Sequence, residues 1–425
     1  MKLICAPGDH KFKEAKGVLN VVLYGSADRQ RRGSAGAAIK DKLARRRLYP
    51  SSRGWDFLSL ALAAIAADLA GHRVKSPDGW TRQFELDVAV ADPAFWNSQQ
   101  ELIQRLLGFL TTDVWKVSFI GGGYSPKPPR NLVVPDDDCI SLLSGGLDSF
   151  IGNLDLAAAG RRPFAVSQTV VGDAENQRAF AKMIGGGLRH LQINHNADVP
   201  DPETPSSQRA RSLIFVAYGV LAATMIKRYR TGDTVTLYVC ENGFISINPP
   251  LTDMRIGSLS TRTTHPALFG LLRQLFDAAG LRVRMENPYQ LKTKGEMLQE
   301  CADKKLLRAY ASQTTSCGRY RIHGHTHCGR CIPCLVRRAA FRAASMKDGT
   351  KYVYTDLGRD DDQHAAFDDV RSVAMALAEV EADGIERWLG TALSTTLLGD
   401  VAPLQAMVGR GLNELAALLK SHGVK

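Results

Sequence analysis

The chain carries the hexapeptide Ser144-Gly145-Gly146-Leu147-Asp148-Ser149 between an apolar run, Ile140 to Leu143, and a stretch that reads as a helix, Leu147 to Ala159. Two glycines allow a tight turn and let backbone N–H groups approach an anion, and the helix that follows adds its positive N-terminal end. The spacing matches neither the Walker motif nor the dinucleotide fingerprint. We therefore predict a nucleotide pyrophosphate site in which all six residues bind phosphate.

Asp148 in this hexapeptide has two interpretations. Its carboxylate can hold the loop or approach a Mg²⁺ ion beside the phosphates. A carboxylate in the first helical turn is equally well explained by capping and by the helix macrodipole. Both interpretations stay open on the sequence alone.

Four cysteines far downstream form a second pattern. Cys317, Cys328, Cys331 and Cys334 are spaced C-x10-C-x2-C-x2-C, which supplies four thiolates for a closed, structural zinc site. An iron–sulfur cluster is the main competitor, and a disulfide reading is weak because nothing suggests secretion. Three histidines in the gap could replace a cysteine, although a solvated loop explains them as well: His323, His325 and His327.

Breaks in composition divide the chain into five predicted parts. Residues 1–124 form a small α/β unit, 125–138 a linker rich in glycine and proline, and 139–290 the main domain. A zinc-binding region, 291–348, and a helical extension, 349–425, follow. The main domain reads β-α-β-α-β-α-β-α-β, which predicts an α/β fold whose parallel, doubly wound sheet is covered on both faces.

Individual elements follow from apolar periodicity. In the first unit we predict strands at Val18–Tyr24, Phe84–Val90 and Trp115–Ile120 and helices at Trp55–Ala70 and Phe95–Leu110. In the main domain we predict strands near Ile140, Phe164, Leu191, Val235 and Val283. In the extension we predict helices near Val370–Glu381, Ile385–Leu389 and Leu404–Leu419.

Composition agrees with a soluble, cytoplasmic enzyme. No run of eighteen apolar residues occurs, and the N-terminus lacks the apolar core of a signal peptide. Much of the net charge of +11 falls in residues 29–53, which we interpret as a solvated loop, with a phosphate or acidic-protein contact as the alternative. The interleaving of aromatic residues expected of a base-stacking platform is missing there, which argues against a nucleic-acid partner.

The hexapeptide resembles the PP-loop of the ATP pyrophosphatases, and four matches in order, the hexapeptide among them, resemble the QueC family of 7-cyano-7-deazaguanine synthases. The matches span Ile140 to Ala344 and include Arg209 ahead of an apolar helix, Lys294 within PYQLKTKGE, and the cysteine region. This resemblance implies a PP-loop fold of the HUP-like, adenine nucleotide alpha hydrolase type. It also implies that ATP, Mg²⁺ and Zn²⁺ are bound and that a carboxylate is activated by transfer of AMP.

The resemblance assigns catalytic roles to Asp148, Arg209 and Lys294. Arg209 and Lys294 would join the loop in stabilising the departing pyrophosphate. Lys294 taken alone could equally be a solvated lysine at a helix start.

The chain departs from the synthases after the predicted strand Thr234 to Cys240. The synthase substrate segment is replaced by Glu241 to Pro250, followed by a stretch rich in Arg, Ser and Thr. Because open α/β sheets bind ligands beyond the carboxyl ends of their strands, we still predict substrate contacts here, against the alternative of a polar surface loop. The candidate substrate residues are Glu241, Asn242, Asn248, Arg255 and Arg262.

The extra N-terminal unit, the extension and the changed pocket together resemble the QueC-like proteins of bacterial antiphage operons, of the QatC and type IV CBASS kinds. That resemblance implies a ligase that joins a 7-deazaguanine carboxylate to an amine, either ammonia or the N-terminal amine of a partner protein from the same operon. A homodimer is a further option, and a membrane partner is not expected.

Three alternatives stay beside this hypothesis. The chain could be a housekeeping synthase with added segments, a tRNA-modifying PP-loop enzyme such as a thiolase, or a non-catalytic scaffold that binds ATP. A thiolase would need a redox-active cysteine near the nucleotide, and Cys139 and Cys240 lie at strand positions typical of a core.

Overall fold

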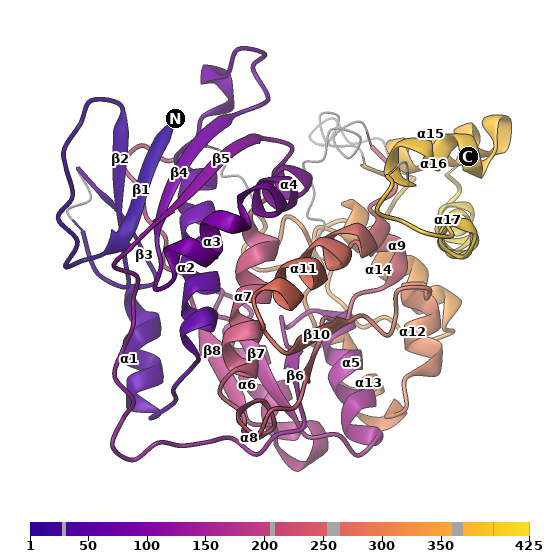
Figure 1. Cartoon of the computed structure of the whole chain (residues 1–425). Helices are drawn as coiled ribbons and strands as arrows, with labels where there is room; N and C mark the ends of the chain where they lie inside the picture. Colours follow the sequence, from indigo (N-terminus) through magenta and orange to yellow (C-terminus); the bar gives the residue numbers. More distant parts are fainter. Residues whose placement is uncertain (28–30, 205–208, 253–263, 359–368, 394, 425) are drawn as a thin grey trace.

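Two five-stranded, all-parallel sheets organise the computed structural model, which describes residues 1–27, 31–204, 209–252, 264–358, 369–393 and 395–424 (Figure 1). The first sheet has the order β3-β2-β1-β4-β5 and the second the order β10-β9-β6-β7-β8. The first contains β1 Lys2–Pro7, β2 Val18–Leu23, β3 Gly33–Ala35, β4 Gln83–Ala89 and β5 Val114–Ile120. The second contains β6 Cys139–Leu142, β7 Pro163–Gln168, β8 His190–Ile193, β9 Val235–Tyr238 and β10 Val283–Glu286.

Both sheets follow one winding scheme. Numbered from its own first strand, each has the order 3-2-1-4-5, so the chain starts at the centre, winds to one edge, and returns to wind to the other. In such sheets ligands bind where the winding reverses, outside the carboxyl ends of the two central strands. For the second sheet that point lies between β6 and β9, which confirms the predicted doubly wound α/β fold.

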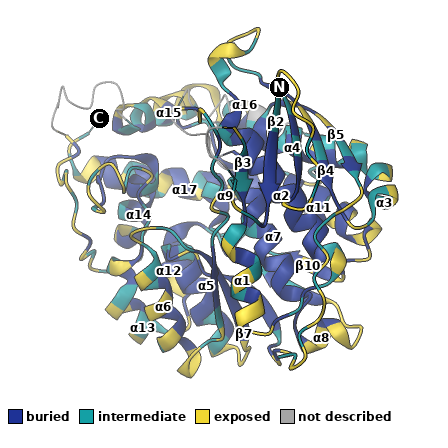
Figure 2. Ribbon diagram, turned by 90° about the vertical axis from the view of Figure 1, so that its left-hand side faces the viewer, coloured by how far each residue is buried: buried dark blue, intermediate teal, exposed yellow. Residues whose placement is uncertain are grey.

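The sheets are joined through buried helices. Helix α2, Ser52–Ala70, packs on the first sheet and against α7, Arg211–Ala223, which covers the second sheet. Beside this pair, α4 (Gln100–Thr111) contacts α11 (Pro266–Ala278). Figure 2 shows α2 and α7 in the colour of buried residues at the centre of the molecule. A helix that is apolar on all sides, as α2 is, requires such enclosure.

The other face of the second sheet carries α5, Leu147–Ala158, and α6, Ala174–Met183. The remaining helices are α1 Ala37–Arg45, α3 Pro93–Ser98, α8 Lys227–Arg230, α9 Gly243–Ile247, α12 Lys294–Glu300, α13 Lys304–Tyr310, α14 Ile332–Ala343, α15 Asp369–Asp383, α16 Ile385–Leu393 and α17 Ala402–Ser421. The last helix, α17, packs on α14, α9 and α12, so the extension adds to the main domain instead of standing apart (Figure 1).

Two sequence expectations were wrong in detail. The single helix expected at Phe95–Leu110 is two helices, because the backbone leaves helical geometry at Gln99, where α3 ends and α4 begins. The basic segment expected as a solvated loop forms β3 and α1 in its described part, and the side chains of Ile39 and Leu43 anchor α1 in the core.

Among the described residues, we find no helix that combines the length and the apolar character needed to cross a membrane.

Buried histidines make acid sensitivity an expected property of the fold. Burial is the main cause that lowers the pKa of His190 to about 4, and Arg46 and other cations add to it. Burial, with a smaller contribution from Arg211, lowers the pKa of His195 to about 4. Unfolded histidine has a pKa near 6.5, so the unfolded state binds more protons below that pH. Between pH 7 and 5 each histidine should reduce the free energy of unfolding by about 1–2 kcal/mol.

Urea unfolding at pH 7 and pH 5 measures this loss. The double variant His190→Gln/His195→Gln should show a clearly smaller difference between the two pH values. An undiminished difference would assign the acid sensitivity to other groups.

Candidate functional site

The hexapeptide forms the turn between β6 and α5. Gly145 has φ +91°, a conformation that favours glycine, and Gly146 caps α5 without any side chain occupying the helix end. Ser149 Oγ donates to Gly146 O at 3.0 Å and accepts from Ser144 N at 3.2 Å, which fixes the turn. The first N–H groups of α5 are thus directed at the crevice where the winding reverses. We call this turn the phosphate loop.

A cavity of about 280 Å³ opens beside the phosphate loop. Its walls come from the loop, the carboxyl end of β9, the start of α12 and the segment that leads into the cysteines. The lining residues are Ser144, Gly146, Leu147, Asp148, Ser149, Cys240, Glu241, Ile245, Lys294, Thr315, Ser316 and Pro333. The structure therefore brings together four segments that the sequence analysis singled out separately.

Asp148 and Lys294 meet inside this cavity. Lys294 Nζ lies 2.5 Å from Asp148 Oδ1, and Asn242 donates to Asp148 Oδ2 through Nδ2 at 2.8 Å and through its backbone N–H at 3.2 Å. The Asp148 carboxylate is thus directed at β9 and α12 instead of its own helix end. Lys294 is nearly buried, which is inconsistent with the alternative of a solvated lysine.

The candidate substrate residues fall into three groups. Glu241 lines the cavity, and its carboxylate accepts from Thr264 Oγ1. Asn242 is fully buried, holds Asp148 and caps α9, whereas Asn248 ends α9 and is not among the residues that line the cavity. Arg255 and Arg262 lie outside the described residues.

Arg209 does not reach the phosphate loop, contrary to the sequence expectation. Its guanidinium donates to Thr111 O at 2.5 Å and to Thr112 Oγ1 at 3.0 Å, both at the end of α4 in the first unit. It also lies 3.9 Å from Asp113. Arg209 therefore links the first unit to the chain that enters α7.

Arg211, two residues further along, is the first residue of α7. It lies near Asp173, and the position of a Cβ on loop residue Gly145 would be 3.4 Å from Asp173 Cβ. Arg209 precedes α7, and its contacts lie with the first unit.

The four cysteines form a compact cluster. Their Sγ atoms all lie within 4.8 Å of one another, with 3.8 Å from Cys317 to Cys331 and 3.9 Å from Cys328 to Cys334. Thiolates about 2.3 Å from a tetrahedral zinc would be about 3.8 Å apart, so the cluster has the dimensions of such a site. Hydrogen bonds from the Cys317 and Cys331 thiols lower the pKa of Cys328, which favours a thiolate there. The cluster could therefore bind zinc.

The described histidines do not join the four sulfurs. His327 Nε2 accepts from Ser316 N at 3.1 Å, so this ring supports the segment before Cys317. His325 lies against Gly172, just ahead of Asp173.

The cysteine cluster is attached to the phosphate loop. Thr315 N donates to Gly145 O at 3.0 Å, two residues before Cys317. A Cβ on Gly146 would lie 3.2 Å from Thr315 O and 3.2 Å from Ser144 Oγ. The loop is therefore fixed on one side by the cluster segment.

We expect the substitution Gly146→Val to abolish measurable nucleotide binding. Its side chain would meet Thr315 O and Ser144 Oγ and displace the backbone that has to approach phosphate. Titration calorimetry with ATP measures the loss, and Gly121→Val, at a glycine with nothing within 4 Å, is the matched control. Unchanged ATP affinity in folded Gly146→Val would rule out the loop as the phosphate site.

No family model matches the chain. Comparison with characterised proteins finds 7-cyano-7-deazaguanine synthases of Brucella canis and of Brucella suis biovar 1, each 30% identical over 186 residues. The similarity covers 42% of this chain and 70% of each relative. By this similarity, which extends over more than two thirds of the relatives, the chain belongs to the 7-cyano-7-deazaguanine synthase family.

Proposed function

We propose that the protein uses ATP to adenylate a 7-deazaguanine carboxylate. A carboxylate oxygen attacks the α-phosphorus of ATP, the bond to the β-phosphate oxygen breaks, and pyrophosphate leaves. The observation that carries this proposal is the shared cavity of the phosphate loop, Asp148 and Lys294 at the winding reversal of the second sheet. The names of the relatives support a deazaguanine as the substrate.

Each side chain has a distinct role in this proposal. Backbone N–H groups of the phosphate loop bind the pyrophosphate, and Lys294 exchanges its contact with Asp148 for a phosphate oxygen as negative charge develops. Asp148 and Glu241 are the carboxylates that line the cavity, and Mg²⁺ prefers such ligands together with substrate phosphates. When bound, the ion would neutralise charge on the departing pyrophosphate.

The substrate would lie against the segment after β9. Glu241 can accept hydrogen bonds from ring N–H groups of a deazaguanine, while Asn242 holds Asp148 in place. Contacts from Asn248, Arg255 and Arg262 stay predictions.

For the second half-reaction we propose amide formation on the N-terminal amine of a partner protein, in a bacterial antiphage setting in the cytoplasm. The amine nitrogen attacks the acyl carbon, AMP leaves, and the nitrogen loses a proton. Two features support a protein acceptor. More than half of the chain lies outside the similarity to the synthases, and the extension packs through α17 on α9 and α12, at the wall of the cavity. Ammonia as the acceptor would require neither feature.

A sulfur-transfer reaction is disfavoured by Cys240, the described cysteine that lines the cavity. Burial, then the charges of Asp155 and Asp148, raises the pKa of this thiol well above its usual range. The nucleophile in sulfur chemistry is the thiolate, which this environment opposes.

The test uses the purified protein with ATP and 7-carboxy-7-deazaguanine. We expect AMP and pyrophosphate only when this acid or a close relative is present. Mass spectrometry of co-expressed operon proteins should then show a partner that gains the mass of the acyl group. A free nitrile with no modified partner would identify a synthase, and tight ATP binding without pyrophosphate release would identify a scaffold.

A further inference from the structure

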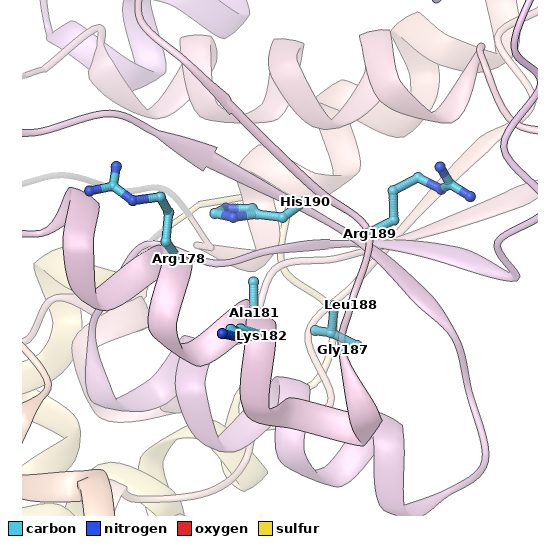
Figure 3. Close-up of a pocket in the computed structure, with 7 residues that line it drawn as sticks. All are labelled: Arg178, Ala181, Lys182, Gly187, Leu188, Arg189 and His190. Carbon is cyan, nitrogen blue, oxygen red and sulfur yellow. The ribbon is translucent and has the colours of Figure 1, made fainter. Parts of the chain in front are cut away.

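A second cavity, of about 510 Å³, lies at the edge of the second sheet, at the amino end of β8. Its lining residues are Arg178, Ala181, Lys182, Gly187, Leu188, Arg189 and His190. Figure 3 shows Arg178, Lys182 and His190 directed to the same side, with Arg189 directed away from them. The phosphate loop follows the carboxyl end of β6, so this cavity is separate from the ATP site.

Helix α1 of the first unit brings more cations to the same place. Arg46 donates through Nη1 to His190 O at 2.6 Å. Burial is the main cause that lowers the pKa of Lys42, and Arg46, Arg45 and Arg178 add to it, so these three arginines lie within electrostatic reach of Lys42. We call the cavity and the surrounding cations the basic groove: Lys42, Arg45, Arg46, Arg178 and Lys182.

The cations of the basic groove are not neutralised by the protein. In the described part of the chain, none of these five residues forms an ion pair with a carboxylate, whereas Arg189, which lines the cavity but is directed away from it, pairs with Asp137 at 2.7 Å. Other cations near the amino ends of strands in the second sheet do form ion pairs with carboxylates. Arg162 pairs with Asp138, Lys227 with Asp136 and Arg228 with Asp233. Unpaired cations that repel one another lose free energy when an anion binds between them.

The lining offers only the small apolar surface of Ala181, Gly187 and Leu188, and none of the large exposed apolar side chains among the described residues lies in it. A protein interface normally has an apolar centre, whereas phosphate contacts need only cations and N–H donors. Three of the five cations are arginines, whose planar guanidinium binds phosphate with two hydrogen bonds.

We propose that the basic groove binds the phosphodiester backbone of a nucleic acid. This inference goes beyond the proposed reaction, which it does not require. The lack of aromatic residues argues against base stacking, but contacts to phosphates do not depend on stacking. Binding should therefore be insensitive to sequence and strongly dependent on salt.

The test measures binding of a short fluorescein-labelled RNA duplex by anisotropy over a range of salt concentrations. The variant Arg45→Gln/Arg178→Gln/Lys182→Gln removes three exposed groove cations. We expect its affinity to fall at least about tenfold and the slope of log K against log salt to become about 3 units less negative, at about 0.9 per phosphate contact. Pyrophosphate release and the melting temperature should stay unchanged.

The matched control is Arg162→Gln/Lys227→Gln/Arg228→Gln, which removes the same charge from paired cations. It should change the affinity by less than about twofold, because its cations are already compensated. Equal losses in both variants, or no binding at low salt, would overturn the proposal. Displacement of the RNA by polyglutamate as readily as by unlabelled RNA would also overturn it and point to an acidic protein.

Discussion

Replacing Cys328 with serine, or stripping the metal with a chelator, is expected to unfold the cysteine region and abolish activity. Structural zinc contributes on the order of 10 kcal/mol to the fold that it closes, which is comparable to the whole stability of a domain. The loss should spread, because α14 begins directly after Cys331 and packs against α12 and α17. Elemental analysis and thermal unfolding measure the two effects.

The matched control for the cluster is Cys301→Ser. Cys301 is also buried, but its thiol lies near Asp155 and outside the four-sulfur group. This variant should retain one zinc per chain and lose only a small part of its stability. Iron in the purified protein, or a fully stable chain without metal, would contradict the zinc assignment.

We expect Lys294→Gln to reduce ATP-dependent pyrophosphate release by about 10²–10³-fold, the usual range for removing one group that stabilises transition-state charge. Lys294 is nearly buried and lies 2.5 Å from Asp148 in the cavity of the phosphate loop. Glutamine is one atom shorter, keeps a polar end and removes the charge, so ATP affinity should fall less than the rate. Single-turnover release of labelled pyrophosphate separates these two effects.

The control for Lys294→Gln is Lys292→Gln, two residues earlier in the chain. Lys292 pairs with Glu300 on the surface of the same helix region, so its loss should leave the rate within about twofold. If Lys292→Gln and Lys294→Gln slow the reaction equally, the role of Lys294 would be structural instead of catalytic.

The periodic parts of the fold could be predicted from the sequence. Strands were expected near Ile140, Phe164, Leu191, Val235 and Val283, and each position falls in a strand of the second sheet. A strand buried on both faces is a continuous apolar run, which is a strong local signal. The edge strand β3 has only three residues, all with small side chains, and the sequence analysis missed it. It is a strand because it pairs with β2, and its own sequence carries no strand signal.

The parts of the candidate site that depend on long-range contacts could not be predicted from the sequence. The sequence placed the phosphate loop and Lys294 by motif, and they do share a cavity. It placed Arg209 at the nucleotide because this residue precedes the apolar helix, but the side chain contacts Thr111 and Thr112 of the first unit, a long-range contact with no local signal. The contact of the cysteine segment with Gly145 and that of α17 with α12 join parts of the chain that carry no common local signal.

Helix α17 completes the surroundings of Lys294. Glu414 accepts a hydrogen bond from Thr293 Oγ1, and Arg410 pairs with Glu296 at 2.6 Å, so both ends of the capping box of α12 are held by the extension. Burial raises the pKa of Glu414, which is consistent with its close fit beside Gly295.

This arrangement sets an order of events during synthesis. Thr293 and Glu414 are 121 residues apart, and a ribosome that adds about 5–20 residues per second needs about 6–24 s to cover that distance. Throughout that interval the capping box of α12 lacks its contacts with Glu414 and Arg410, and Phe244, which packs against Gly411, is uncovered. The newly made chain therefore carries an unfinished candidate site and an apolar surface that chaperones can recognise until α17 has emerged from the ribosome.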